Sequence, residues 1–134
     1  MQKYQLRTRN RVEFQDITAS VADAIRSQQV DSGLCVVYCP HTTAAITINE
    51  NADPDVPRDI NAFMNSTIPH RGDYRHAEGN SDSHIKAAYV GPSQTLIIHA
   101  GRPLLGRWQG VFFCEFDGPR DRTFYVKVMK DPHE

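Results

Sequence analysis

The stretch GLCVVYCPHTTAAITIN, residues 33–49, is the longest run of strand-forming residues in the chain. β-Branched and aromatic side chains are enriched in it, which favours β structure. Pro40 stands near its middle and predicts a bulge or bend there. Beyond His41 the side chains alternate, and this period of two predicts one core face and one small, polar face. The predicted core face holds Thr42, Ala44, Ile46 and Ile48.

Further elements lie on both sides of this strand and predict an α+β fold. Residues 3–9 and 11–17 read as two strands that turn at Asn10, and apolar residues at helical spacing predict a helix that begins near residue 17. Further helices are expected at 54–68 and 82–90, and further strands at 94–100, 107–116 and 123–130. Residues 69–81 carry no period, and a long irregular loop of this kind is often functional. A chain of 134 residues is expected to form a single domain, residues 1–134.

The composition argues against several classes of protein. The chain has 15 Lys and Arg residues against 16 Asp and Glu residues, so an unspecific grip on nucleic acid or on an anionic membrane is poorly supported. It has neither an apolar signal core nor a run of about 20 apolar residues, so no membrane span is expected. Three cysteines without a CxxC pair fit a reducing compartment, and we expect a cytoplasmic protein.

The small polar face of the 41–49 strand has two readings. It could form the floor of a binding site, with His41 at one end and the polar segment NENADPD, residues 49–55, at the other. Alternatively, the strand faces solvent, and Asn51 and Asp53 cap a helix that begins at Pro54. The pattern alone leaves both readings open.

A second polar cluster lies in the segment RHAEGNSDSHIKAA, residues 75–88. His76 and His84 could join His41 as three imidazole ligands of Zn or a similar metal, with coordination positions left open. The spacing between His76 and His84 is not a metal-binding signature. In the structural alternative, Ser81 or Asp82 caps the helix and His84 sits exposed in its first turn.

Arginines near turns toward the carboxyl end form a third candidate group. A guanidinium can hold phosphate oxygens in a bidentate manner, but exposed arginines are also common without any ligand. Trp108 reads either as a pocket wall or as a core residue. The arginines in question are Arg102, Arg107, Arg120 and Arg122.

Four motifs together resemble the YjbQ-like family, whose members are often labelled secondary thiamine-phosphate synthase. They are PHTTAAITINENADPDV, NSDSHIKAA, VGPS and GRWQGVFFCEFDGPRDR, which occur in this order over almost the whole chain. The resemblance implies an α+β fold with a β-sandwich core of jelly-roll character and two or three helices. It also implies a homotrimer with sites at or near the subunit contacts.

The resemblance further implies roles for individual residues. The family's motif histidines match His41, His76 and His84, the expected ligands of a divalent metal ion such as Zn. The expected catalytic carboxylates are Glu50, Asp53 and Asp82. The groups expected to bind a small phosphorylated substrate are Asn51, Asn80, Trp108 and Arg120.

Three functions follow as expectations. The first is a thiamine-phosphate synthase-like transferase of weak or secondary activity, in which Mg²⁺ and arginines would stabilise the departing pyrophosphate. The second is a metal-dependent hydrolase of a small phosphorylated metabolite, with Glu50 or Glu78 as the base. The third is a non-catalytic protein that binds a metal or a small anion.

Overall fold

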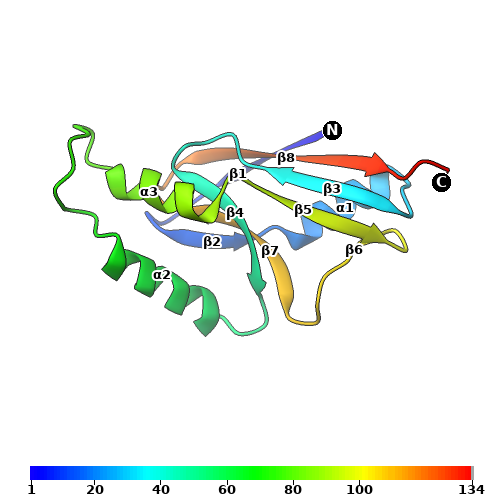
Figure 1. The fold of residues 1–134 in the computed structure, drawn as a ribbon, viewed down its shortest axis with the longest axis horizontal. Helices are drawn as coiled ribbons and strands as arrows, with labels where there is room; N and C mark the ends of the chain where they lie inside the picture. Colours follow the sequence, from blue (N-terminus) through cyan, green and yellow to red (C-terminus); the bar gives the residue numbers. More distant parts are fainter. Residues whose placement is uncertain (134) are drawn as a thin grey trace.

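Two antiparallel sheets packed face to face form the centre of the computed structural model, which describes residues 1–133 (Figure 1). The five-stranded sheet has the order β1 (Gln2–Arg7), β8 (Asp121–Lys130), β3 (Gly33–Tyr38), β5 (Ser93–His99) and β6 (Arg102–Pro103). The three-stranded sheet has the order β2 (Glu13–Asp16), β7 (Gln109–Glu115) and β4 (Ala44–Glu50). The predicted α+β class with a sandwich core is therefore confirmed.

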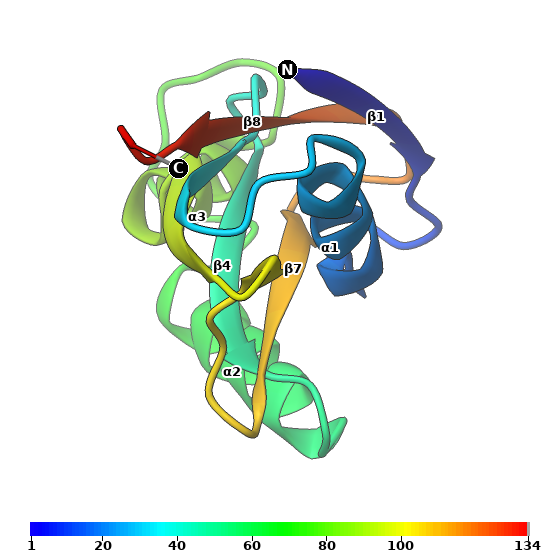
Figure 2. The ribbon, with the colours of Figure 1, turned by 90° about the vertical axis from the view of Figure 1, so that its right-hand side faces the viewer.

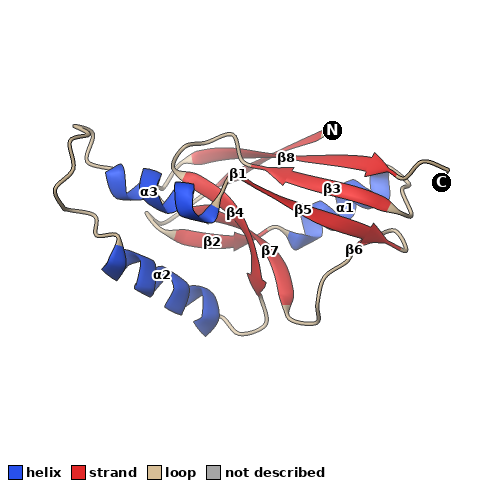
Figure 3. Ribbon diagram, viewed as in Figure 1, coloured by secondary structure: helices blue, strands red, loops and turns tan. Residues whose placement is uncertain are grey.

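Three helices lie around the sandwich within residues 1–133: α1 (Thr18–Ser27), α2 (Asp55–Thr67) and α3 (Ser81–Val90). Figure 3 shows α2 and α3 together at one end, joined by the loop 68–80, with α1 away from them. The view in Figure 2 places α1 beside β7 and below β8, and α1 also contacts β6. None of the three helices is long and apolar enough to cross a membrane.

The apolar side chains form two buried clusters, one on each face of the three-stranded sheet. The larger cluster fills the space between the two sheets and includes Val37, Ile46, Phe113 and Phe124. The smaller one lies under α2 and α3, where Ala45, Phe112 and Ala87 meet. The three-stranded sheet is therefore covered on both faces, and α3 packs directly on β4.

The stretch 33–49 crosses from one sheet to the other. Its first half is β3 in the five-stranded sheet, and its second half begins β4 in the three-stranded sheet, so the bend predicted at Pro40 is a change of sheet. Ala44 and Ile46 face the larger cluster, as predicted. The opposite face is not an open floor, because Ala45 is fully buried in the cluster beneath α3.

The two amino-terminal strands do not pair with each other, although the chain does turn near Asn10. β1 pairs with β8 and β2 pairs with β7, so they belong to different sheets. The connection is held by side chains instead: the backbone N–H groups of Arg9 and Asn10 donate to the carboxylate of Glu13. A hairpin interpretation misses this because local sequence does not reveal pairing partners more than 90 residues away.

A buried ion pair joins the two sheets. Arg122 of β8 donates from Nε to both carboxylate oxygens of Glu115 in β7, at 2.9 and 3.1 Å. Thr8 donates to the same carboxylate at 2.6 Å, and Arg122 Nη2 donates to Thr43 Oγ1 at 2.9 Å. Glu115 is completely buried and Arg122 is 5% exposed. The pair is therefore compensated by bonds to Thr8, which follows β1, and to Thr43 in the 39–43 crossover, as a buried charge requires.

We predict that Glu115→Ala destabilises the protein by about 3–5 kcal/mol, because it leaves the Arg122 guanidinium buried without its carboxylate. The measurement is urea unfolding at pH 7 followed by circular dichroism. Asp121→Ala is the matched control, since it breaks the exposed pair of Arg7 and Asp121 and should change the stability far less. Equal losses in the two variants would contradict a structural role for the buried pair.

Candidate functional site

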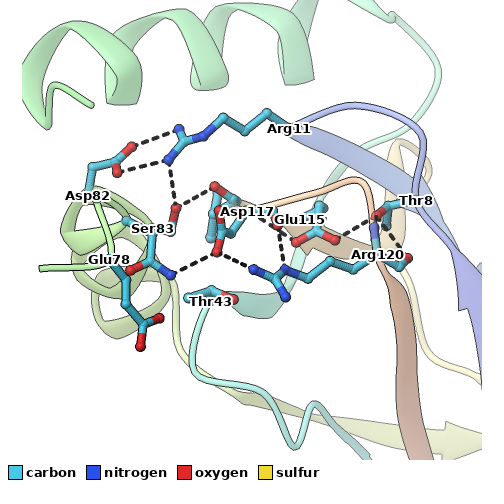
Figure 4. A network of polar contacts seen from close by, with 12 residues as sticks. Thr8, Arg11, Thr43, Glu78, Asp82, Ser83, Glu115, Asp117 and Arg120 are labelled. Atoms are coloured by element: carbon cyan, nitrogen blue, oxygen red, sulfur yellow. Dashed lines mark hydrogen bonds and ion pairs between the residues drawn. The ribbon is translucent and has the colours of Figure 1, made fainter. Parts of the chain in front are cut away.

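The first turn of α3 is fixed to the sandwich by a buried carboxylate. Asp82 has no exposed surface, and Arg11 holds its two oxygens with Nη1 and Nη2 at 3.0 and 3.1 Å (Figure 4). Ser83 is also fully buried and donates to the carbonyl of Phe116 at 2.6 Å. These contacts tie α3 to the β1–β2 connection and to the end of β7. Asp82, a predicted catalytic residue, is therefore engaged in a bidentate pair.

Asn80 and Arg120, both predicted to bind a phosphorylated substrate, meet at Asp117. Asn80 Nδ2 and Arg120 Nη2 donate to the same carboxylate oxygen at 2.8 and 3.0 Å, and Arg120 Nε donates to the Asp117 carbonyl at 2.7 Å. The Arg120 guanidinium is thus bound by Asp117, three residues before it in the same turn. Gly118 is required there, because a Cβ at this position would lie 2.3 Å from the Asn10 carbonyl oxygen. The anion-binding roles of Asn80 and Arg120 stay predictions.

His76 and His84 come together beside this anchor. Their ring centroids are 5.3 Å apart and the rings are nearly perpendicular, at 85°. The Glu78 carboxylate lies 3.8 Å from His76 Nε2, close enough for an ion pair when the ring is protonated. The His76 side chain is 43% exposed, so solutes can reach it. The two imidazoles and the carboxylate form a compact group able to accept and donate protons.

Two clefts open around this group. One, of about 410 Å³, is lined by residues of the 70–81 segment that include His70, Tyr74, His76 and Glu78. The other, of about 400 Å³, shares Tyr74 and His76 with the first and adds His84. Volumes of this size suit small-molecule ligands. Tyr74 is held in place by the hydrogen bond from its hydroxyl to the Pro69 carbonyl at 2.6 Å.

His41 does not join the other two histidines. Its Nε2 accepts a hydrogen bond from the backbone N–H of Thr123 at 2.9 Å, and its ring stands edge-on to Phe113. Burial, followed by the nearby positive charge of Arg122, lowers the pKa of His41 below the ordinary histidine value. Its Nε2 lone pair is therefore occupied by the backbone.

The predicted three-histidine metal pocket is wrong. Within the part of the chain that the structure describes, no three side chains of His, Cys, Asp or Glu form a group that could hold a metal ion. The Nε2 atom of His41 is bound by the backbone of Thr123 in β8. Only the pair of His76 and His84 is left. The expectation that Mg²⁺ accompanies a phosphorylated ligand stays a prediction.

The remaining predicted site residues lie at the far end of β4. Asn51 follows this strand directly, whereas His41 precedes it, and seven residues at about 3.3 Å each separate the two ends by more than about 20 Å. Asn51 donates to Asp16 at 3.0 Å, and its side chain fits only because Gly110 has no Cβ. Asp53 Oδ1 accepts from the N–H of Asp55 at 2.9 Å, at the start of α2, but Pro54 stands at the cap position without a side-chain capping bond, so the predicted caps Asn51 and Asp53 do not occupy it.

Trp108 and Glu50 lie at the same end. Trp108 is 53% exposed, and the Arg107 guanidinium lies 4.7 Å from its ring centroid. Trp108 therefore is not a core residue, and Glu50 pairs with Gln109 across the β4–β7 ladder. The structure brings the predicted site residues into two groups at opposite ends of β4, with His41 apart from both. The functional roles proposed for Glu50, Asn51, Asp53 and Trp108 stay predictions.

Three residues near α3 were missed by sequence reasoning. Lys86 is fully buried beside Asp82, Arg11 closes the pair from the β1–β2 connection, and His70 lines the cleft. Asp82 and Lys86 are four residues apart on one helix face, a spacing that could have indicated their contact. No local signal points to Arg11, because it is 71 residues from Asp82 in sequence.

A family model for the UPF0047 protein YjbQ-like family matches residues 2–131. The chain belongs to this family. A UPF0047 protein of Methanocaldococcus jannaschii is 57% identical over 129 residues, which cover 96% of this chain and 94% of that protein. The UPF0047 protein YugU of Bacillus subtilis is 50% identical over 127 residues, which cover 93% of this chain and 96% of that protein.

Solved structures of YjbQ-like proteins have the same fold. The crystal structure of an uncharacterised YjbQ/UPF0047 protein from Clostridium acetobutylicum matches with a TM-score of 0.95 and 53% identity, over 96% of this chain and all of that one. A protein of this type from Sulfolobus solfataricus, described as of unknown function, matches with a TM-score of 0.93 at 26% identity, over 97% and 96% of the two chains.

These findings correct the functional expectations. The relatives are named only as UPF0047 proteins, and none of these names carries a thiamine-phosphate synthase activity. The predicted transferase with a metal-binding pocket is therefore wrong. The metal-dependent hydrolase and the metal-binding module depended on the same pocket, which the described residues do not form. Binding of a small anion did not depend on that pocket and stays a prediction.

We predict that His41→Gln weakens the dependence of stability on pH. The native state favours the neutral ring, because its pKa is lowered, whereas the unfolded chain takes up the proton near pH 6.5. The stability contributed by His41 is therefore complete above about pH 6.5 and is lost as the pH falls below it. Urea unfolding of both proteins at pH 7.5 and 5.0 measures this. An unchanged difference between the two pH values in the variant would contradict it.

Proposed function

We propose that this protein is an acid–base catalyst that acts on a small polar molecule bound in the cleft of about 400 Å³ that both His76 and His84 line. His76 and His84 transfer the protons, and Glu78 orients the ring of His76. The observation that carries the proposal is the perpendicular contact of the two imidazoles, with centroids 5.3 Å apart, beside a carboxylate and in the lining of one cleft.

The chemistry of these groups supports proton transfer. Histidine is the side chain best suited to exchange protons near neutral pH, and two neighbouring rings can serve one as base and the other as acid. A positioned acid or base contributes about 10²–10⁴-fold to a rate. The Glu78 carboxylate holds a charged His76 ring by ion pairing, at the 3.8 Å separation of the pair.

The surroundings supply positioning groups. Ser81 and Tyr74 line the same cleft, and the pair of Asp82 and Arg11 holds in place the wall that α3 forms. His84 is in the first turn of α3, so the same anchor fixes it relative to the sandwich. The acid–base pair therefore combines one residue on a rigid helix with one on a loop.

The test uses hydrolysis of p-nitrophenyl acetate, a general probe of imidazole reactivity, between pH 5.5 and 8.5. We predict that His76→Gln and His84→Gln each lower the rate by about 10²-fold or more, since each removes one proton-transfer group. His99→Gln is the matched control, because His99 is exposed at the end of β5, and it should keep the wild-type rate.

The His99→Gln control distinguishes catalysis at the site from hydrolysis by any exposed imidazole. The chain has six histidines, so unspecific hydrolysis by imidazoles would fall by only about one sixth on loss of any one. A loss of that size in His84→Gln would contradict the proposal. Loss of the wild-type rate on adding EDTA would also contradict it.

We also propose that the protein is a homotrimer. An exposed apolar row on the outer face of the five-stranded sheet supports self-association: Leu34, Ile97 and Met129 are neighbours across three strands and are 42%, 56% and 54% exposed. Contiguous apolar surface of this kind marks interfaces.

We predict that the 15.2-kDa chain sediments at three times its mass at micromolar concentration. Leu34→Asp should shift it to the monomer, because a charge would be buried at the contact. Thr95→Asp, on the same face but outside the apolar row, is the control and should change the assembly less. A monomeric wild-type protein would contradict the proposal.

A further inference from the structure

Lys86 is the one buried lysine among the four in the chain. Its side chain is 1% exposed, whereas Lys3, Lys127 and Lys130 all lie on the surface. Lysine is almost never fully buried unless its charge is compensated. The surroundings of this amine therefore decide whether it is a structural cation or a reactive group.

The compensation of Lys86 is incomplete. Its Nζ donates to the neutral amide oxygen of Asn65 at 2.5 Å and lies 3.6 Å from Asp82 Oδ2. That carboxylate is already bound at both oxygens by Arg11. One carboxylate thus faces two cationic side chains, and Arg11 holds the better geometry.

These surroundings lower the pKa of the Lys86 amine. Burial is the main cause that lowers the pKa of Lys86, and the positive charge of Arg11 acts in the same direction, against the attraction of Asp82. Lysines that are desolvated or that lie beside another cation are the ones that act as nucleophiles at neutral pH.

Lys86 also lies in the wall of a cavity. A cavity of about 330 Å³ is lined by Lys86, Asp82 and Asn65 together with Arg11, Val12 and His70. A small molecule of a few non-hydrogen atoms fits into such a volume. His70 contributes a second proton-exchanging group, and its Nε2 lies 3.0 Å from the Gly79 carbonyl oxygen.

We propose that Lys86 is a nucleophilic amine that forms an imine with a small aldehyde or ketone bound in this cavity. The nitrogen lone pair attacks the carbonyl carbon, and the carbonyl oxygen takes up a proton to give a carbinolamine. Loss of the hydroxyl group as water and of the nitrogen proton leaves the C=N bond. His70 is the wall residue that moves these protons. The sum is one carbonyl compound plus one amine giving one imine and one water, without oxidation or reduction.

The test traps the imine with acetaldehyde and sodium cyanoborohydride at pH 7, followed by peptide mapping by mass spectrometry. We expect Lys86 to be alkylated several-fold faster than Lys3, Lys127 and Lys130, although it is the least exposed of the four. Surface accessibility alone gives the opposite order, so slower labelling of Lys86 than of the exposed lysines would overturn the proposal.

Two further measurements complete the test. Lys86→Arg keeps a cation beside Asp82 but has no nucleophilic amine, so it should lose this adduct while the three exposed lysines label as before. In protein unfolded in urea all four lysines should label at similar rates, and the order seen in the wild-type folded protein decides the question even if the variant does not fold. Persistent rapid labelling at the surface lysines alone would overturn the proposal.

Discussion

The carboxylate of Asp82 is the interaction on which the arrangement of the candidate site depends. It is completely buried in the first turn of α3 and is held at both oxygens by Arg11, which comes from the β1–β2 connection. Removal of Arg11 would leave this buried carboxylate without its bidentate partner, which is costly. The pair therefore fixes where α3 lies, and with it His84 and one wall of the cleft.

The two buried carboxylates, Glu115 and Asp82, differ in the number of cations around them. Between the two sheets, Glu115 and Arg122 are matched one to one and bonded on all sides. Under α3, one carboxylate faces both Arg11 and Lys86. The first arrangement is a complete structural pair. In the second, the Lys86 amine donates to the neutral amide of Asn65, lies 3.6 Å from the shared carboxylate and belongs to a residue that lines a cavity. The two buried ion pairs thus differ because Glu115 has one cationic partner, whereas Asp82 has two.

The sequence indicates most elements of the fold, because their signals are local. The helix over residues 54–68 and the break at Gly91 follow from apolar spacing and from turn residues, and both are present in the structure. The pairing of strands is not local. Residues 33–49 look like one long strand, yet the chain passes from one sheet to the other near Pro40, and only the distant partners β8 and β7 reveal this.

The candidate site was predictable in part for the same reason. His76 and His84 are eight residues apart across a loop and a helix start, and the structure brings them into contact. His41 resembles a third member in sequence, but its ring nitrogen is bound by the backbone of Thr123, which is 82 residues away. No local signal points to Arg11. Lys86 lies in the NSDSHIKAA motif, four residues after Asp82, but its importance follows from burial and from the shared carboxylate of Asp82.

Amide hydrogen exchange of Arg11→Met compared with the wild type tests the central claim most directly. Methionine keeps much of the apolar stem of Arg11 but leaves the Asp82 carboxylate without its bidentate partner. If this pair fixes α3, the amides of residues 85–90 should exchange much faster in the variant, while those of β3 and β7 in the sandwich keep their wild-type rates. Unchanged exchange in α3 would contradict the claim that the buried Asp82 carboxylate positions the site.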